Sequence, residues 1–581
     1  MSAGYFENER EDMTVNDGKW FSEARFGMML HWGLYSLLGG EYKGRQCGGA
    51  DDGGANELGE WIQSFFAIPC AEYEQYARAF NPIGFDAEEY VKMARDAGMN
   101  YLVVTSKHHE GFAMFKSDAD PYNIVDATPF GRDPIAELAA ACKKYGVKFG
   151  LYYSQELDWH EPDGGGYTLG YKNAGSSWTN NWDFPDNAHK DFSRCFEKKI
   201  KPQVKEILTR YGEISVIWFD TPSVISPAQS RELYDLVKKY QPNCLVNSRI
   251  GNGMGDYASM GDNQVPGAKK NRDMLYETAA TLNDTWGYKS YDQNWKTPEQ
   301  VISLLTRLAS RNVNYLLNIG PDHLGRIPVG AQKVLREVGE WMKVNAEAVY
   351  ATEPSPYSVD LMSGPVTEKG DSLYFFVNKP EHELLVPGVL TQVESAEVLG
   401  AGRAHFTQEG ALVRVELPDL TGKIIPVVKL TAQGGVKVDE GLIELPDFGF
   451  LLTGSTAKIE GGITLGNACD AMNWKSPEDG MSWTVSADRA GEYAVEMTVN
   501  GLHGTEPLET EVDLSVNGET SRRSVRHDRD IEALIARYHR GMIAELGNVA
   551  LKAGENHIAL RLAEPAARDM FRFASMRLIR R

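Results

Sequence analysis

The stretch Asp133-Pro-Ile-Ala-Glu-Leu-Ala-Ala-Ala-Cys-Lys-Lys-Tyr-Gly146, followed by Val147-Lys-Phe-Gly-Leu-Tyr-Tyr153-Ser154, predicts one helix and the strand after it. Asp133–Pro134 is typical of a helix start and Gly146 of a helix end. The run Val147–Tyr153 is largely apolar on both faces, which is typical of a strand buried in a parallel sheet. This alternation of a helix with a buried strand indicates an α/β domain.

The same alternation extends from about Gly18 to Tyr350. Further helix starts are predicted at Asp86, with Glu89 placed as in a capping box, and at Thr297–Pro298. Because the strands are apolar on both faces, a TIM-like (β/α) barrel over residues 1–352 is favoured over an open sheet. The other strand candidates are Phe26–Leu30, Tyr101–Thr105, Ile214–Phe219, Cys244–Asn247 and Val313–Ile319.

Beyond residue 352 the pattern changes to short alternating strands separated by Gly and Pro, which predicts all-β modules. A chain of 581 residues is also too long for a single hydrophobic core. We predict two β-sandwich domains, 353–456 and 457–581, of which the second either binds carbohydrate or is only structural. The segment Ser521–Leu546 is rich in Arg and His and is expected to be an inserted loop or helix.

The charge of the chain restricts the kinds of molecule that it is expected to bind. With 60 Lys and Arg against 81 Asp and Glu, the formal net charge is -21, so neither nucleic acid nor an anionic membrane surface is expected to bind. The start of the chain lacks a signal peptide, so a cytoplasmic location is expected, or a secreted or periplasmic one if the sequence was trimmed. The six cysteines lack the spacing of zinc or redox sites. The oligomeric state is not indicated.

Polar residues directly follow several predicted strands, and in a β/α barrel such positions converge on one mouth. They include His31, Lys107–Glu110 and Asp220. Imidazoles, a guanidinium, carboxylates and the aromatic faces of Trp32, Trp61, Tyr153 and Trp218 together suit a polyhydroxylated ring. The sequence therefore indicates a sugar-binding pocket.

Asp220 follows the buried run Val216–Phe219, which would give a carboxylate the fixed aim that a nucleophile needs. Alternatively, Asp220 caps a helix entered through Thr221–Pro222. His108 and His109 are adjacent, so only one of them faces the pocket unless the strand has already ended.

A divalent metal held by imidazoles and a carboxylate is an alternative to carboxylate catalysis. His31, His108, His109 and Asp220 could supply nitrogen and oxygen ligands, but no spaced ligand motif is present, so we expect neither a metal nor a cofactor. A serine nucleophile lacks its G-x-S-x-G turn.

Several blocks of the sequence resemble the family 29 glycoside hydrolases, which are α-L-fucosidases, and the resemblance spans about Trp20 to Thr352. The blocks are Arg25-Phe-Gly-Met-Met-Leu-His31-Trp-Gly-Leu-Tyr-Ser36, Gly59-Glu60-Trp61, Thr105-Ser-Lys-His-His-Glu-Gly111, Gly150-Leu-Tyr-Tyr-Ser154, Ile217-Trp-Phe-Asp220 and Tyr315-Leu-Leu-Asn-Ile-Gly-Pro321. The resemblance implies that Asp220 is the nucleophile and forms a covalent glycosyl-enzyme. It also implies a fucose pocket made of His31, Glu60, Trp61, His108, His109, Tyr153, Trp218 and Arg249.

The acid/base catalyst is less directly indicated, because the glutamate that some members use is Gly267 here. We expect Asp262 to serve first and Glu277 second. Alternatively, Asp262 is a turn residue and Glu277 holds Arg249 or a histidine in place. The carboxyl groups of a retaining pair should lie about 5–5.5 Å apart.

The expected activity is that of a retaining exo-α-L-fucosidase that hydrolyses terminal α-L-fucose from oligosaccharides or glycoconjugates. Three alternatives are a sugar-binding protein on an inactive fucosidase scaffold, an α-L-galactosidase, and a metal-dependent barrel hydrolase. The sugar of an α-L-galactoside differs from fucose only by a hydroxyl at C6, and an apolar wall of the pocket rejects an added hydroxyl poorly.

Overall fold

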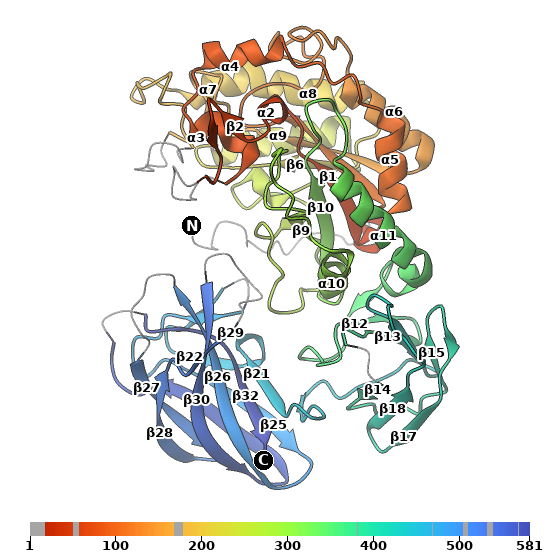
Figure 1. Cartoon of the computed structure of the whole chain (residues 1–581). Helices are drawn as coiled ribbons and strands as arrows, with labels where there is room; N and C mark the ends of the chain where they lie inside the picture. Colours follow the sequence, from red (N-terminus) through yellow and green to blue (C-terminus); the bar gives the residue numbers. More distant parts are fainter. Residues whose placement is uncertain are drawn as a thin grey trace.

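The computed structural model describes residues 18–49, 57–167, 178–379, 382–466, 469–502, 509–531, 539–566 and 569–581. An N-terminal α/β domain lies at one end of the molecule, and two β modules lie below it in the view of Figure 1. A groove of about 970 Å³ is lined by residues of all three, among them Lys269, Glu440 and His557. The multidomain fold predicted from the sequence is therefore confirmed.

A sheet of eight parallel strands forms the centre of the N-terminal domain as far as the chain is described. The strands follow one another around the sheet in chain order, and β1 pairs with both β4 and β10. An isolated parallel bridge between Asn247 and Tyr257 links the end of β7 to the start of β8, so the sheet curls into the predicted TIM-like barrel. The strands are β1 (Phe26–Leu30), β4 (Tyr101–Lys107), β5 (Lys148–Tyr153), β6 (Val216–Phe219), β7 (Leu245–Val246), β8 (Ala258–Ser259), β9 (Tyr276–Thr281) and β10 (Asn314–Ile319).

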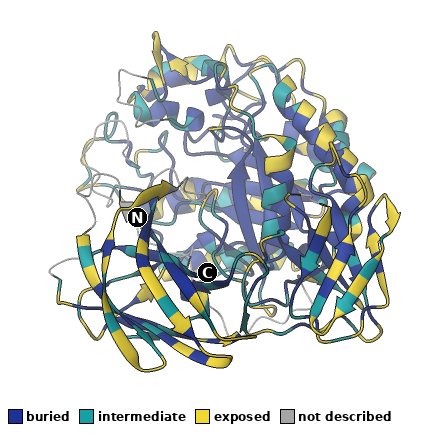
Figure 2. Ribbon diagram, turned by 60° about the horizontal axis from the view of Figure 1, so that its bottom comes forward, coloured by how far each residue is buried: buried dark blue, intermediate teal, exposed yellow. Residues whose placement is uncertain are grey.

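All six strands expected from the sequence are present, and β8 and β9 are the two that were not anticipated. Every residue of β1, β4, β6, β9 and β10 is buried, and these strands form the dark centre of Figure 2. Strand β8 has only two residues, and β9 has the polar sequence Tyr-Glu-Thr-Ala-Ala-Thr, so neither shows the continuous apolar run of a buried parallel strand.

The helices around the barrel begin and end as their sequences indicate. The Asp86 side chain accepts hydrogen bonds from the backbone of Glu88 and Glu89, and Thr297 forms a capping box with Gln300. Gly146 ends its helix at φ 73°, a conformation that glycine adopts without strain. The helices are α1 (Lys19–Ala24), α2 (Tyr35–Leu38), α3 (Ile62–Phe65), α4 (Cys70–Ala77), α5 (Ala87–Asp96), α6 (Pro134–Tyr145), α7 (Phe192–Cys195), α8 (Lys201–Arg210), α9 (Pro227–Tyr240), α10 (Pro298–Ala309) and α11 (Val329–Asn345).

The middle module packs a six-stranded antiparallel sheet against a three-stranded one around its own apolar core. Helix α11 leads into it, and the indole N–H of Trp341 donates to the carbonyl of Ile425 at 3.0 Å. The strands are β11 (Glu353–Pro354), β12 (Val366–Lys369), β13 (Ser372–Phe376), β14 (Glu383–Val386), β15 (Ser395–Val398), β16 (Gly402–Arg403), β17 (Phe406–Glu409), β18 (Leu412–Glu416) and β19 (Val427–Thr431).

The C-terminal module is also a sandwich of two sheets around a separate core. Two of its strands precede residue 457: β20 pairs with β25, and β21 pairs with β32. The strands are β20 (Leu442–Ile443), β21 (Phe450–Thr453), β22 (Lys458–Glu460), β23 (Thr464–Leu465), β24 (Ala471–Met472), β25 (Gly480–Ala487), β26 (Gly491–Leu502), β27 (Glu509–Val516), β28 (Glu519–Arg526), β29 (Arg529–Ile531), β30 (His539–Leu551), β31 (Gly554–Leu562) and β32 (Arg572–Arg580).

The expectation of a loop or helix over Ser521–Leu546 is wrong where the structure describes this segment, which forms β28, β29 and the first part of β30. Residues 532–538 lie outside the described residues. Strand β28 lies at the edge of its sheet and is mostly exposed. Charged residues protect edge strands from pairing with other chains, so a charge-rich sequence here is compatible with a strand.

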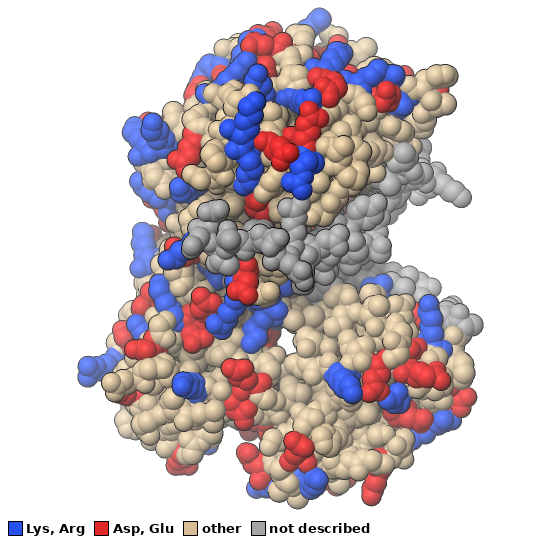
Figure 3. Space-filling model, turned by 180° about the vertical axis from the view of Figure 1, so that it is seen from behind, with Lys and Arg blue, Asp and Glu red and all other residues tan. Residues whose placement is uncertain are grey.

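No helix of the described residues is long and apolar enough to cross a membrane. On the face shown in Figure 3, acidic and basic side chains are interspersed over the surface.

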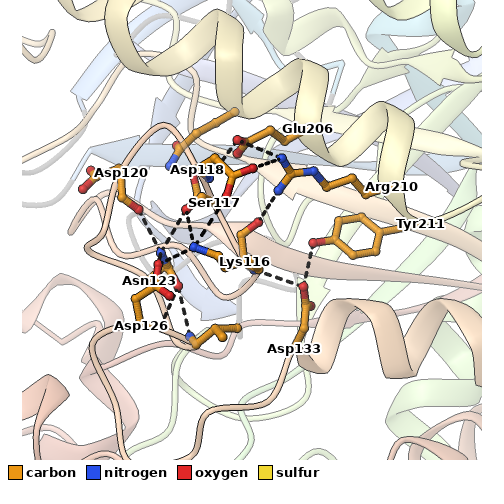
Figure 4. Close-up of polar contacts among 12 residues, drawn as sticks. Lys116, Ser117, Asp118, Asp120, Asn123, Asp126, Asp133, Glu206, Arg210 and Tyr211 are labelled. Carbon is orange, nitrogen blue, oxygen red and sulfur yellow. Dashed lines mark hydrogen bonds and ion pairs between the residues drawn. The ribbon is translucent and has the colours of Figure 1, made fainter.

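The segment after β4, which begins with His108 and His109, is fastened to the end of helix α8 (Figure 4). The guanidinium of Arg210 donates to the carbonyl of Lys116 at 2.8 Å and to the carboxylate of Asp118 at 2.6 Å. The hydroxyl of Tyr211 donates to Asp133 Oδ2 at 2.8 Å. These contacts hold the middle and the end of the segment, so they stabilise the loop that leads away from the barrel mouth.

Replacing Tyr211→Phe removes only the hydroxyl that binds Asp133. We expect the free energy of unfolding to fall by about 1–2 kcal/mol, because the lost hydrogen bond is to a carboxylate but is only partly buried, with KM unchanged. Denaturant titration measures the first quantity and steady-state kinetics the second. A large change in KM with unchanged stability would contradict the structural role.

Candidate active site

Asp220 directly follows β6, and both of its carboxylate oxygens are held by donors. The hydroxyl of Tyr152 donates to Oδ2 at 2.9 Å, and Nη1 of Arg249 donates to Oδ1 at 3.0 Å. The side chain is 14% exposed, so it is not turned into the protein interior. Helix α9 starts at Pro227 and is capped by Ser226, so Asp220 is not a helix cap.

Arg249 follows β7 and joins two carboxylates. Besides Asp220, its guanidinium donates to Asp262 Oδ1, and it lies 4.5 Å above the ring of Trp218. Further donations reach the hydroxyl of Ser259 and the carbonyl of Met260, both at 3.1 Å. Burial opposes the charge on this guanidinium, but the two carboxylates outweigh it and raise the pKa of Arg249, so the side chain stays cationic.

Asp262 lies in the loop after β8, and its side chain is 46% exposed. Asn263, the next residue, has φ 58°, so the segment also forms the turn that its sequence indicates. Through Arg249, Asp262 is brought to the same cluster as Asp220. Because its side chain is partly exposed, Asp262 is accessible to water beside the proposed nucleophile.

Glu277, the second acid/base candidate, is not brought to the strand ends. It is the second residue of β9 and is fully buried. Its carboxyl accepts hydrogen bonds from the indole N–H of Trp218 at 2.8 Å and from the hydroxyl of Tyr101 at 2.7 Å. Burial raises the pKa of Glu277 to about 7. Trp218 thus binds Glu277 through its N–H and Arg249 through its ring face, which favours a positioning role for Glu277.

Three buried histidines lie together beside Asp220. The ring centroids of His31 and His108 are 5.4 Å apart, and those of His108 and His109 are 4.1 Å apart. Strand β4 ends at Lys107, so the strand alternation no longer applies and both adjacent histidines join the cluster. Nε2 of His109 lies 3.9 Å from Asp220 Oδ2.

Burial keeps all three imidazoles neutral. It lowers the pKa of His31 and of His108 to about 3, and the pKa of His109 falls well below its usual value for the same reason. In this state each ring offers one N–H donor and one lone pair, so the three histidines serve as hydrogen-bonding groups for an uncharged ligand.

Two of these rings have an orientation fixed by their neighbours. Asn318 donates its amide N–H to the carbonyl of Trp286, so its oxygen accepts from Nδ1–H of His31 at 2.6 Å. Ser154 donates its hydroxyl to the carbonyl of Leu157, so its oxygen accepts from Nδ1–H of His109 at 2.8 Å. In both histidines Nε2 therefore carries the lone pair.

Glu60 and Trp61 come from the short helix Gly59–Trp61 before α3. The Trp61 ring packs edge-on against His109 at 5.0 Å and against Trp159 at 5.2 Å, so it extends the aromatic surface beside the histidines. Glu60 is buried and accepts from the backbone of Gly287 at 2.7 Å, and burial raises its pKa to about 7.

Two aromatic residues predicted to line the pocket lie elsewhere. Tyr153 is fully buried on the other side of β5, where its hydroxyl donates to Gln203 of α8 at 2.8 Å. Trp32 stacks on Phe85 at 5.1 Å. The prediction selected the wrong member of the tyrosine pair, because Tyr152 is the one that reaches Asp220.

Sequence reasoning missed Tyr152 although the chain carries a signal for it. Tyr152 pairs with Trp218 in the parallel register of β5 and β6, and paired residues share a face of the sheet. Since Trp218 was expected in the pocket, Tyr152 should have been expected there as well. Three further residues were also missed: Trp286, whose ring centroid lies 5.2 Å from that of His31, Asn318, which binds His31, and Gln155, whose side-chain oxygen accepts from the backbone N–H of Asp220 at 2.6 Å.

Within the described residues, no group of three or more His, Cys, Asp or Glu side chains is arranged to hold a metal ion.

The family model for α-L-fucosidase matches residues 2–347. The chain belongs to the α-L-fucosidase family, which is a family of glycoside hydrolases. It is 28% identical over 431 residues to the α-L-fucosidase of Branchiostoma floridae, a match that covers 70% of this chain and 90% of the relative. The tissue α-L-fucosidase of Rattus norvegicus is 29% identical over 434 residues, with 70% and 87% covered.

Solved structures extend the likeness. The α-L-fucosidase from Vibrio sp. strain EJY3 is 28% identical and matches with a TM-score of 0.82, covering 98% of both chains. The α-L-fucosidase AlfC from Lactobacillus casei, solved in complex with α-L-fucose product, is 52% identical, with a TM-score of 0.53 and coverage of 56% of this chain and 98% of that one. The first therefore resembles the whole chain, and the second matches slightly more than half of it.

The two neighbouring tyrosines of β5 provide a matched test of the site. Tyr152→Phe removes a hydrogen bond to a charged carboxylate, worth about 1.5–3 kcal/mol, so we expect kcat/KM for an aryl α-L-fucoside to fall about ten- to hundredfold. Tyr153→Phe should lower stability and leave kcat/KM nearly unchanged. Equal losses of activity in both variants would show that the assignment of faces is wrong.

Proposed function

We propose that this chain is a retaining exo-α-L-fucosidase that releases terminal α-L-fucose from oligosaccharides or glycoconjugates by double displacement. One observation carries the proposal: the Asp220 carboxylate is aimed by Tyr152 and Arg249 beside a second, water-accessible carboxylate, Asp262. Structures of variants of AlfC in complex with 4-nitrophenyl-α-L-fucopyranoside and with Fucα(1,6)GlcNAc support the choice of substrate.

In the first step, an Asp220 oxygen attacks the anomeric carbon while the bond to the leaving oxygen breaks, and Asp262 transfers a proton to that oxygen. In the second step, Asp262 takes a proton from water, whose oxygen attacks the anomeric carbon and displaces Asp220. Two inversions leave fucose in its original α configuration. Tyr152 and Arg249 hold the carboxylate of Asp220 in position for the first displacement and stabilise it when it leaves in the second.

The neutral histidines suit the hydroxyl groups of the sugar ring. His31 and His109 present Nε2 lone pairs, which accept hydrogen bonds from hydroxyls, while Trp61 supplies an apolar surface for a ring face or a methyl group. A charged sugar would gain no charge–charge attraction from imidazoles that remain uncharged at neutral pH.

Azide rescue tests the roles of the two aspartates. Asp220→Gly should reduce kcat by at least about 10³-fold, as removal of a nucleophile does, and added azide should give β-fucosyl azide from an aryl α-L-fucoside. Asp262→Ala should give α-fucosyl azide, because azide then attacks the fucosyl-enzyme. NMR spectroscopy of the products identifies the anomers. Failure of the wild-type enzyme to cleave the aryl fucoside, or faster cleavage of an aryl α-L-galactoside, would refute the proposed substrate.

Glu277→Gln keeps the size of the side chain and its acceptor for Trp218 but removes the ionisable carboxyl. If Glu277 positions Trp218, kcat should change by less than about tenfold and azide should have no effect. Production of α-fucosyl azide by this variant, and not by Asp262→Ala, would reassign the acid/base catalyst to Glu277.

A further inference from the structure

Several buried polar atoms behind the histidines have no hydrogen-bond partner among the described residues. They are both carboxyl oxygens of Glu110, Nδ1 of His108, and the hydroxyls of Tyr35, Tyr73 and Tyr122. The side chain of Glu110 is 1% exposed, and an unpaired buried polar group usually costs about 1–3 kcal/mol. Such a group in a native protein calls for an explanation, for example a catalytic role or a bound water.

His108 differs from the other two histidines in what its Nδ1 faces. His31 and His109 bind the fixed acceptors Asn318 and Ser154 through this atom, whereas Nδ1 of His108 lies 3.6 Å from Glu110 Oε2. This separation is longer than a direct hydrogen bond, so a small movement of the carboxyl or one bridging water is needed to join the two groups. Space for the carboxyl is available because residue 33 is glycine: a Cβ at Gly33 would lie only 2.5 Å from Glu110 Oε1.

We propose that Glu110 is a positioning residue that sets the tautomer of His108: its protonated carboxyl donates to Nδ1, and Nε2–H of His108 then faces the substrate. The proposal rests on the proposed function, because it takes the three histidines to bind the sugar. His31 and His109 supply acceptors, and His108 supplies the donor. A sugar hydroxyl both donates and accepts, so a mixed set of this kind holds it better than three acceptors.

The surroundings of Glu110 favour the protonated carboxyl. Burial raises the pKa of Glu110 to about 8, and the backbone N–H groups of Leu34 and of Glu110 itself, which lie near the carboxyl without meeting hydrogen-bond geometry, offset only part of this effect. The facing charges are Lys107, which lowers the pKa, and Asp158, which raises it; these two form an ion pair at 3.0 Å. Tyr35, Tyr73 and Tyr122 are neutral, because burial raises the pKa of each hydroxyl well above its usual value.

The sign of the pH dependence follows from this arrangement. Below about pH 8 Glu110 carries the proton and donates to His108. Above that pH the carboxylate becomes an acceptor, Nδ1 of His108 takes the proton, and Nε2 turns into a third lone pair. The donor to the sugar is then lost, so KM should rise on the alkaline side.

The decisive variant is Glu110→Gln, whose amide can still donate to Nδ1 but does not titrate. At pH 6.5 its kcat/KM for an aryl α-L-fucoside should stay within about threefold of the wild type, and the rise of KM near pH 8 should disappear. ¹⁵N NMR spectra of histidine-labelled enzyme show which ring nitrogen carries the proton. Between pH 7 and 9, the proton of His108 should move from Nε2 to Nδ1 in the wild type only. The His108→Asn variant assigns these signals.

Glu206→Gln is the matched control, because Glu206 is a buried glutamate on α8 away from the site, and it should retain the wild-type pH profile. Glu110→Leu offers no donor and should raise KM about tenfold with a smaller change in kcat. If Glu110→Gln keeps both the alkaline rise of KM and the wild-type NMR behaviour, the proposal is overturned. Tautomer exchange governed by Glu110 in a protein that cleaves no fucoside would instead refute the proposed function.

Discussion

The buried guanidinium of Arg249 is the interaction on which the candidate active site depends. It binds Asp220, Asp262, Ser259 and a backbone carbonyl at once, so it links the ends of β6, β7 and β8. Burying an ion is costly unless it is paired and its donors are satisfied, and removal of one partner typically costs about 3–5 kcal/mol. The barrel mouth is therefore held in shape by the same charge that holds the carboxylate of Asp220 in position.

The layer beneath Arg249 supports this arrangement. The indole of Trp218 lies under the guanidinium and is fixed from below by Glu277, which also binds Tyr101. A buried carboxyl in such a place orients an aromatic ring that in turn orients a cation. The polar sequence of β9 then has a physical explanation: Glu277 is inside the barrel because an indole N–H and a phenol need an acceptor there.

The sequence predicted the barrel well because its signals are local. Helix caps at Asp86, Asp133 and Thr297 and apolar runs such as Phe26–Leu30 depend on short stretches of chain, and the structure has them where they were expected. Strands β9 and β28 were not predicted, because tertiary context overrides their composition. Strand β9 is polar although it lies inside a barrel, and β28 is charged because it lies at a sheet edge.

Side-chain direction was harder to predict than strand position. Asp220 comes directly after its strand and Arg249 three residues after Val246, so both could be placed at the barrel mouth without knowledge of the register. The choice between Tyr152 and Tyr153 requires the register against Trp218. The adjacent histidines show the opposite case, since the end of β4 at Lys107 removes the alternation that would have separated them. Which nitrogen carries the proton then depends, in two of the rings, on partners distant in sequence, Asn318 for His31 and Ser154 for His109, so the hydrogen-bonding character of the site is a property of the fold and not of the motif.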